Sequence, residues 1–248
     1  MSAKRSVRPV AETAVCTLLD WDTEFWGVPI GRVEGETLDA ERLRAVDGWA
    51  DENAVACLYF LADSADAPSA HAAEAGGFRL MDLRVELRRP VDGDDSLADL
   101  RDARPEDADA LRAIARSSHG VTRFYADPGF PNERCDDLYD TWISRSLEGW
   151  ADGVLVAEVD GRPAGYVSCH LDETGTGSIG LIAVDAEVRR AGLGVALSRG
   201  AVAWCRDRGA ERMSVVTQGR NAAALRTFQR ADFLVESIGL WFHKWYRP

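Results

Sequence analysis

Residues 181–197 of this chain are Leu181-Ile182-Ala183-Val184-Asp185-Ala186-Glu187-Val188-Arg189-Arg190-Ala191-Gly192-Leu193-Gly194-Val195-Ala196-Leu197. The first four residues form an apolar run that is typical of a buried strand, and the last residues open an apolar helix. Between them lies a short turn with two arginines, and a Gly-x-Gly pattern begins the helix. Glycines at this place let a ligand approach the backbone, because no Cβ stands in the way.

The beginning of this helix is suited to a phosphate group. The N–H groups of a first helical turn and the positive end of the helix dipole favour a bound pyrophosphate. Arg189 and Arg190 add positive charge at the same end. A simpler interpretation is that Gly192 and Gly194 only let the strand and the helix pack closely. Two other phosphate motifs are excluded, because no Gly-Lys-Ser/Thr follows and Leu197 stands where the dinucleotide motif has its third glycine.

Helix and strand patterns alternate on both sides of this segment. In the C-terminal part, the expected strands are 98–101, 154–159, 164–170, 178–184, 212–217 and 234–245, and the expected helices are 105–117, 132–147, 192–207 and 221–230. Asp160-Gly161 predicts a tight hairpin turn after the second of these strands. In the N-terminal part, the expected strands are 15–19, 55–61 and 78–87, and the expected helices are 39–53 and 67–75.

A polar, acidic stretch with Pro90 and Gly93 occupies residues 89–96 and predicts a linker. It divides the chain into an N-terminal α/β segment, residues 1–90, and a C-terminal domain, residues 97–248. The order of the elements predicts a mixed α/β protein of the α+β type.

Composition excludes several function classes. The chain has 248 residues and a formal net charge of -12, which repels phosphate backbones and argues against a general nucleic-acid binder. Its apolar runs are far shorter than the ~20 residues that span a bilayer, and no apolar stretch follows the basic residues near Met1, so we expect no membrane partner and no signal peptide. Five widely spaced cysteines without a CxxC pair indicate reduced thiols in the cytoplasm and no metal site.

The loop Arg189-Arg190-Ala191-Gly192-Leu193-Gly194 resembles the R/Q-x-x-G-x-G/A loop with which GNAT N-acetyltransferases hold the pyrophosphate of acyl-CoA. The strand before it, and the helix, strand and Asn221-x-x-Ala224-x-x-x-Phe228 pattern after it, follow in the order of that family. The resemblance spans residues 100–245. It implies the GNAT acyl-CoA N-acyltransferase fold, with a twisted sheet that splays near Ala183 and an extra N-terminal half-size α/β subdomain that shapes the acceptor pocket.

The resemblance also implies where acetyl-CoA, the expected co-substrate, binds. Backbone N–H groups of Ile182 and Val184, on either side of Ala183, are expected to hold the pantetheine arm. The side chain of Asn221 is expected to bind the end of that arm. The implied pyrophosphate loop consists of Arg189, Arg190, Ala191, Gly192, Leu193, Gly194 and Val195.

One residue departs from the family pattern. The usual proton donor is a tyrosine seven residues after the asparagine, and here that residue is Phe228, which cannot give a proton. His170, at the end of an expected strand, and Tyr125 are the candidate catalytic residues, while His71 and His119 lie in segments expected at the surface. Otherwise solvent protonates the thiolate, or the chain binds acyl-CoA without efficient transfer.

A narrower resemblance concerns the acceptor. Trp21-Asp22-Thr23-Glu24-Phe25-Trp26-Gly27 is similar to the W-D-x-x-F-F-G opening of the dTDP-fucosamine acetyltransferase group, which acetylates the 4-amine of a nucleotide-linked deoxysugar. The aromatic residues of this stretch also suit core packing. A second similar segment places the expected substrate contacts at Arg123, Phe124, Tyr125 and Trp142.

The sequence therefore predicts an N-acyltransferase that moves an acetyl group from acetyl-CoA to a primary amine, expected on a dTDP-4-amino-4,6-dideoxygalactose or a similar nucleotide-linked amino sugar. Two alternatives stay open at this point: another small-molecule or peptide amine, or an acyl-CoA-binding regulatory protein without turnover. The expected partner is the small-molecule amine, and the aromatic C-terminal stretch 241–246 is compatible with a homodimer.

Overall fold

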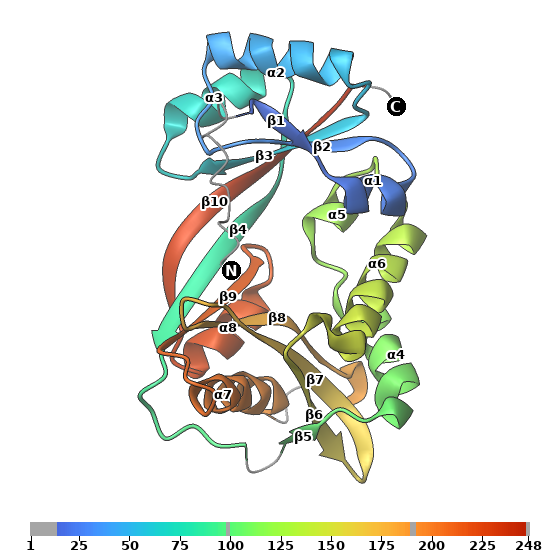
Figure 1. The fold of residues 1–248 in the computed structure, drawn as a ribbon, viewed down its shortest axis with the longest axis vertical. Coiled ribbons are helices and arrows are strands. Elements are labelled where there is room, and N and C mark those ends of the chain that lie inside the picture. Colours follow the sequence, from blue (N-terminus) through green and yellow to red (C-terminus); the bar gives the residue numbers. More distant parts are fainter. Residues whose placement is uncertain (1–13, 98–99, 189–191, 247–248) are drawn as a thin grey trace, which may run out of the picture. The chain divides into compact units, whose positions relative to one another are not determined.

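The computed structural model describes residues 14–97, 100–188 and 192–246 (Figure 1). Contacts between Cα atoms divide the chain into two compact units: Met1–Met81 with Leu240–Pro248 (unit 1), and Asp82–Gly239 (unit 2). Both boundaries fall inside strands, β4 (Arg79–Pro90) and β10 (Leu234–Trp245), so each of these strands contributes to both units. The boundary expected from the linker, between residues 90 and 97, remains a prediction about which segments fold by themselves.

Unit 1 is a small α/β unit with its own core. Strand β2 pairs antiparallel with β1 and parallel with β3. Helices α2 and α3 begin at aspartates whose side chains accept backbone N–H groups, Asp39 and Asp66, as good N-cap residues do. The elements are β1 (Cys16–Leu18), α1 (Asp20–Trp26), β2 (Ile30–Val33), α2 (Ala40–Glu52), β3 (Cys57–Asp63) and α3 (Ala67–Ala75).

Unit 2 contains the strand–turn–helix segment of residues 181–197. Its strands lie in the order β10-β4-β9-β8-β7-β6-β5, with β8 and β9 parallel and the β4/β9, β5/β6, β6/β7 and β7/β8 pairs antiparallel. Its further elements are β5 (Leu100–Asp102), α4 (Ala108–Ser118), α5 (Arg123–Ala126), α6 (Asn132–Arg145), β6 (Gly153–Val159), β7 (Arg162–Leu171), β8 (Thr176–Val184), α7 (Leu193–Arg206), β9 (Arg212–Gln218) and α8 (Ala222–Arg230).

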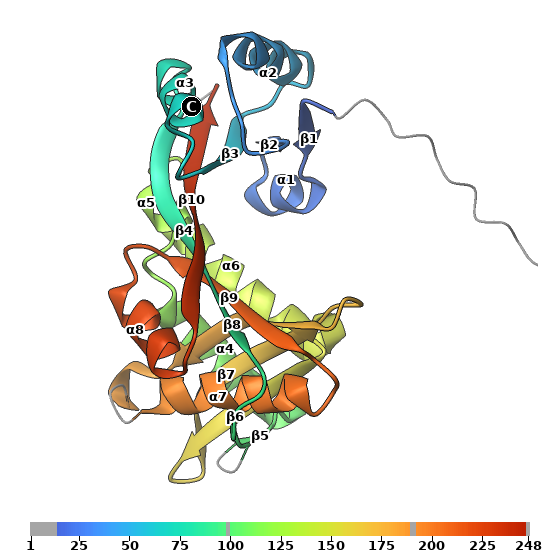
Figure 2. The ribbon, with the colours of Figure 1, turned by 90° about the vertical axis from the view of Figure 1, so that its left-hand side faces the viewer.

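Helices cover both faces of the unit 2 sheet. Helices α7 and α8 lie on one face, and α4 and α6 lie on the other (Figures 1 and 2). The main core lies beneath α7 and α8, where Leu197 and Trp204 pack with alternate residues of the strands, such as Val167 and Val215. The alternation of the strands decides which side chains enter this core and which face α4 and α6.

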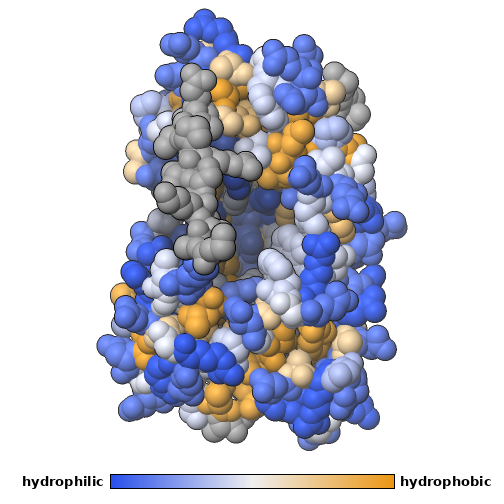
Figure 3. All heavy atoms as spheres, in the orientation of Figure 1, coloured by the Kyte–Doolittle hydropathy of each residue, from blue (hydrophilic) through white to orange (hydrophobic). Residues whose placement is uncertain are grey.

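The hydropathy of the surface is consistent with the many charged residues of the sequence. On the face shown in Figure 3, hydrophilic residues prevail and apolar residues form small groups between them. Within the described residues, no helix is both long enough and apolar enough to cross a membrane.

Most expected elements are confirmed to within two or three residues. The hairpin turn forms at Asp160 and Gly161, both with positive φ (51° and 73°). Among the α-helices and β-strands of the described residues, three short ones were not expected: α1, β2 and α5. They have four to seven residues, too few for a hydrophobic period to show, and no residue of α1 is buried, which corrects the expectation of core packing for its aromatic side chains.

The expected linker is also corrected at its beginning. Arg89 and Pro90 belong to β4, where they pair with Met213 and Arg212 of β9. The Arg89 guanidinium then bonds to Asp95 at 2.7 Å, with 6% and 4% of the two side chains exposed. It also donates to the carbonyl oxygen of Ala231 at 2.7 Å, so a buried ion pair holds the polar stretch against the end of α8.

Removal of this arginine is expected to destabilise unit 2. In Arg89→Met the Asp95 carboxylate stays buried without its main partner, so we expect the free energy of unfolding to fall by about 3 kcal/mol or more. Arg88→Met is the matched control, because Arg88 is an exposed neighbour that pairs with Glu86 and Glu236 and should matter by about 1 kcal/mol or less. Urea unfolding of both variants measures the difference, and equal losses would show that the buried pair has no special weight.

Candidate functional site

The two parallel strands of unit 2 separate along their length. Strand β8 pairs with β9 from Thr176 opposite Arg212 only as far as Ile179 opposite Val215. Beyond that point β8 remains paired with β7, and β9 remains paired with β4. The sheet therefore opens between β8 and β9 over the stretch that contains Ala183, as the sequence analysis expected.

A β-bulge in β8 coincides with the start of this opening. Between Val167 and Cys169 of β7 lies one residue, Ser168, whereas the matching stretch of β8, from Ile179 to Ile182, contains two. The Oγ atom of the fully buried Ser168 accepts the N–H of Leu181 at 2.8 Å. A bulge of this kind bends its strand and increases its twist, which gives a physical reason for β8 to leave β9 here.

The bulge leaves no room for a side chain at Gly180. A Cβ atom at this position would lie 2.5 Å from Nε2 of His170 and 2.9 Å from Oγ of Ser168. Glycine is therefore required here by close packing.

The N–H groups of β8 after the bulge alternate between the two sides of the strand. Those of Leu181 and Asp185 point to β7, where they bond to Ser168 Oγ at 2.8 Å and to the Ala164 carbonyl oxygen at 2.9 Å. By alternation, the N–H groups of Ile182 and Val184 point to the β9 side, into the opening. Donors in this position can bind an extended, amide-containing chain such as pantetheine.

Helix α7 begins next to this opening. Its N-cap, Gly192, has a φ of 83°, a conformation that a residue with a Cβ rarely adopts. The Gly192 carbonyl accepts the N–H groups of Val195 and Ala196, while the N–H groups of Leu193 and Gly194 precede the first intrahelical bond and suit an anion. The expected loop residues Arg189, Arg190 and Ala191 lie outside the described residues.

Comparisons with known proteins agree with this geometry. Residues 109–233 match the Acetyltransferase (GNAT) family. The chain is 30% identical to a dTDP-fucosamine acetyltransferase of Escherichia coli O6:H1 over 68% of this chain and 72% of that protein. The chain belongs to the GNAT acetyltransferase family.

Other relatives of this GNAT chain are more distant. A mycothiol acetyltransferase of Rhodococcus erythropolis is 26% identical over 62% of this chain and 59% of its own length. Among solved structures, a GCN5-related N-acetyltransferase from Sphaerobacter thermophilus has a TM-score of 0.67 and 17% identity, covering 94% of this chain and 76% of that one. Such a structure shares the fold, and the two curated relatives are acetyltransferases.

Two residues of the GNAT pattern lie on α8. Asn221 is the N-cap of α8, and its Oδ1 accepts the N–H of Ala224 at 3.1 Å, so the side-chain amide group is the donor that it can offer to a ligand. Phe228, in place of the usual tyrosine, is 2% exposed and packs edge-on against Phe233 with ring centroids 5.9 Å apart. Here the position of the usual acid is part of the hydrophobic core.

The backbone of His170 lies before the opening, but its imidazole reaches the bulge, because a Cβ atom at Gly180 would lie 2.5 Å from Nε2. Its backbone stands opposite Ser178, where β8 is still paired with β9. Along β7 the backbones of His170 and Tyr166 are four residues apart, roughly 13 Å. Its ring meets Trp150 edge-on at 5.0 Å, and burial lowers the pKa of the imidazole, partly opposed by Asp152. A catalytic role for His170 stays a prediction.

The expected acceptor-side residues form two groups. The Tyr125 hydroxyl donates to the Asp136 carboxylate, and burial, with Asp136 beside it, raises the pKa of the phenol, which makes it a weaker acid. Phe124 is buried against Phe130, and the Arg123 guanidinium lies 4.2 Å above the Phe124 ring.

The second group surrounds a histidine that the sequence analysis placed at the surface. His119, at the end of α4, is half-buried: its Nε2 lies 3.3 Å from the hydroxyl of Tyr166 on β7, and its ring stacks on Tyr139 of α6 at 4.4 Å. Trp142 meets Tyr139 edge-on at 5.3 Å, so one expected substrate residue belongs to this cluster. Sequence reasoning missed the cluster because its members come from three separate elements.

A buried carboxylate was also missed. Asp82, at the start of the unit 2 part of β4, accepts the N–H of Leu83 at 2.8 Å and of Arg220 Nε at 3.3 Å. Burial raises the pKa of Asp82, which the Leu83 N–H and Arg220 partly offset. Because Arg220 follows the end of β9, this carboxylate lies at the β9 side of the opening.

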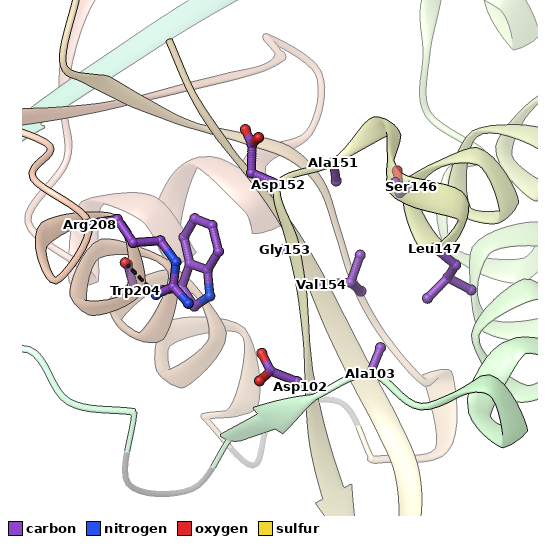
Figure 4. A pocket seen from close by; sticks show the side chains of 11 residues that line it. Asp102, Ala103, Ser146, Leu147, Ala151, Asp152, Gly153, Val154, Trp204 and Arg208 are labelled. Atoms are coloured by element: carbon purple, nitrogen blue, oxygen red, sulfur yellow. Dashed lines mark hydrogen bonds between the residues drawn. The ribbon is translucent and has the colours of Figure 1, made fainter. Parts of the chain in front are cut away.

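A pocket of about 340 Å³ lies elsewhere in unit 2 (Figure 4). The Arg208 guanidinium stacks 3.7 Å above the Trp204 ring there, near the C-terminal end of α7. Trp204 is eleven residues from Leu193, roughly 16 Å along the helix, so this pocket is separate from the opening. Its lining consists of Asp102, Ala103, Ser146, Leu147, Gly149, Ala151, Asp152, Gly153, Val154, Trp204 and Arg208.

Loss of the Ser168 hydroxyl is expected to weaken binding of the pantetheine part of acetyl-CoA. Ser168→Ala leaves the Leu181 N–H buried without its acceptor, so the bulge should shift and displace the N–H groups of Ile182 and Val184. We expect Kd to rise about tenfold for both acetyl-CoA and acetyl-pantetheine in calorimetric titrations. Ser214→Ala, in the stretch where the strands stay paired, should leave both constants unchanged. Unchanged binding in Ser168→Ala would mean that the bulge does not position the donors.

Substitution at the start of α7 should weaken the binding of acetyl-CoA but not that of acetyl-pantetheine. Gly192→Ala strains a left-handed backbone by roughly 1–2 kcal/mol and should move the first N–H groups of α7. We expect about tenfold weaker binding of acetyl-CoA. Binding of acetyl-pantetheine, which lacks the pyrophosphate, should not change. If both ligands weaken equally, the helix start does not hold the pyrophosphate.

Proposed function

We propose that this GNAT enzyme transfers the acetyl group of acetyl-CoA to the primary amine of a nucleotide-linked amino deoxysugar. The observation that carries the proposal is the 30% identity with the dTDP-fucosamine acetyltransferase, which extends over most of both chains. The aromatic residues around His119, including Trp142, offer flat apolar surfaces of the kind that bind sugar and base rings.

Acetyl-CoA fits the opening between β8 and β9. Its pantetheine arm would accept N–H groups of Ile182 and Val184, its pyrophosphate would lie at the start of α7, and the Asn221 amide would contact the arm from the β9 side. This placement would bring the thioester to the stretch of β8 between the bulge and Ala183, between the two faces of the sheet.

The reaction needs the amine in its neutral form. Asp82 is a base of suitable chemistry, because a buried carboxylate with a raised pKa takes up a proton more readily than an exposed one. In the reaction the amine nitrogen bonds to the acetyl carbon, the carbon–sulfur bond breaks, the nitrogen loses a proton and the sulfur gains one.

A second candidate is the same transfer to a different amine. The similarity to a mycothiol acetyltransferase favours it, because that relative carries a different acceptor in its name. Binding of acyl-CoA without turnover is the third reading, and it rests on Phe228 alone.

The acceptor can be identified by product mass. We expect incubation with acetyl-CoA and dTDP-4-amino-4,6-dideoxygalactose to give a product one acetyl group heavier. The matched 4-hydroxy sugar nucleotide, which lacks the amine, should stay unchanged. Acetylation of another amine in the same panel, with the sugar unreacted, would support the second candidate. Bound acetyl-CoA with no product from any amine would support the third.

A further inference from the structure

The side chains of one tyrosine, Tyr166, and one histidine, His119, meet beside the segment where acetyl transfer is expected to occur. Tyr166 stands directly opposite Ala183, the residue between the two N–H donors of the opening, so their Cα atoms are about 4.5–5.5 Å apart. Residues opposite one another in a sheet point to the same face, and for this pair it is the face covered by α4 and α6. The phenol is thus next to the thioester stretch and away from the core that contains Phe228.

The end of α4 joins this arrangement from above β7 and β8. Ser118 Oγ donates to the carbonyl oxygen of Val184 at 3.4 Å, and the next residue, His119, reaches the Tyr166 hydroxyl with Nε2 at 3.3 Å. The His119 ring is held flat against Tyr139, at an interplanar angle of 15°. Two contacts of successive residues therefore fix the imidazole beside the last residue of β8.

The chemistry of the pair matches what Phe228 lacks. Tyr166 is fully buried, and burial raises the pKa of its phenol, so the hydroxyl is protonated at neutral pH but is a weak acid, as Tyr125 is. Unlike Tyr125, which lies beside a carboxylate, it has an imidazole at its oxygen that can supply a proton as the phenol gives one away. A histidine exchanges a proton near neutral pH, so it can return to the phenol a proton that the phenol gives away.

We propose that Tyr166 protonates the departing CoA thiolate and that His119 restores its proton, in place of the tyrosine that Phe228 replaces. As the carbon–sulfur bond breaks, the Tyr166 hydroxyl gives its proton to the sulfur. Nε2–H of His119 gives its proton to the phenolate oxygen, and the neutral imidazole takes a proton back from water. The proton lost by the amine balances that uptake. The role rests on acetyl transfer from acetyl-CoA as proposed above, and it serves any amine acceptor.

The first test needs no acceptor. A phenol that donates to the thiolate stabilises its charged form, so the thiol of CoA bound to the wild-type protein should ionise at a lower pH than in Tyr166→Phe. Ultraviolet absorbance of the thiolate, followed against pH with saturating CoA, measures this, and we expect a shift of about one pH unit, a tenfold change in the ionisation constant. Coincident curves would overturn the role of Tyr166.

The second test uses whichever amine the protein acetylates. We expect Tyr166→Phe and His119→Gln to lower kcat by about 100-fold, with KM for acetyl-CoA within twofold. Because His119 must be protonated to act, the kcat of the wild-type protein should fall as pH rises through the ionisation of His119. This fall of kcat with pH should be absent in His119→Gln. Within the described residues, the groups that face the imidazole include Tyr166 from β7 and Tyr139 from α6, while Arg116 on its own helix is paired with Asp140.

Controls separate this role from structural damage. His71→Gln, an exposed histidine on α3, should leave kcat and its pH profile unchanged. If Tyr166→Phe fails to fold, His119→Gln decides, because it leaves the core untouched. A tenfold gain in kcat for Phe228→Tyr, with wild-type rates in both other variants, would show that no donor replaces the missing tyrosine and would overturn the proposal. A thiol shift that depends on Tyr166, with the amino sugar unreacted, would support the pair and refute only the acceptor.

Discussion

The hydrogen bond from the Leu181 N–H to the buried Ser168 hydroxyl is the contact on which the rest of the site depends. It holds an extra residue in β8, and an extra residue in one strand must bend that strand away from a straight partner. Because β8 leaves β9 at this point, backbone N–H groups that would otherwise point to a neighbouring strand point into the opening. The same bulge changes which residues of β8 face each side, and so it places Ala183 opposite Tyr166.

The two faces of the opened sheet differ in what they can supply. On the face of α7 and α8 the side chains are apolar, and Phe228 belongs to that core. On the face of α4 and α6 the side chains next to the opening are aromatic and titratable, with Tyr166, His119 and Tyr139 in contact. Because Phe228 offers no proton on the first face, the proposed donor comes from the second.

Strand β4 shows how a segment that is remote in sequence completes the sheet of unit 2. It precedes the acidic stretch in sequence, yet it pairs with β9 over seven residues and is tied down by the buried Arg89–Asp95 pair. Through Asp82 it also brings a buried carboxylate to the β9 side of the opening. Where β8 departs, β9 is still paired with β4 on its other side. A strand from an earlier part of the chain therefore stabilises one edge of the opening.

By itself the sequence determined the features that depend on neighbours along the chain. They are the hairpin at Asp160-Gly161, the long helices, the apolar strand 181–184 and the glycine start of α7. All of them follow from periodicity and local backbone preference. It also determined that Phe228 cannot be an acid, since that follows from chemistry alone. Only the tertiary structure decided that β4 joins β9, that Ser168 accepts Leu181, and that His119 meets Tyr166 rather than solvent. These contacts join residues 13 to more than 100 positions apart, and no local pattern carries information about which strand or helix lies opposite another.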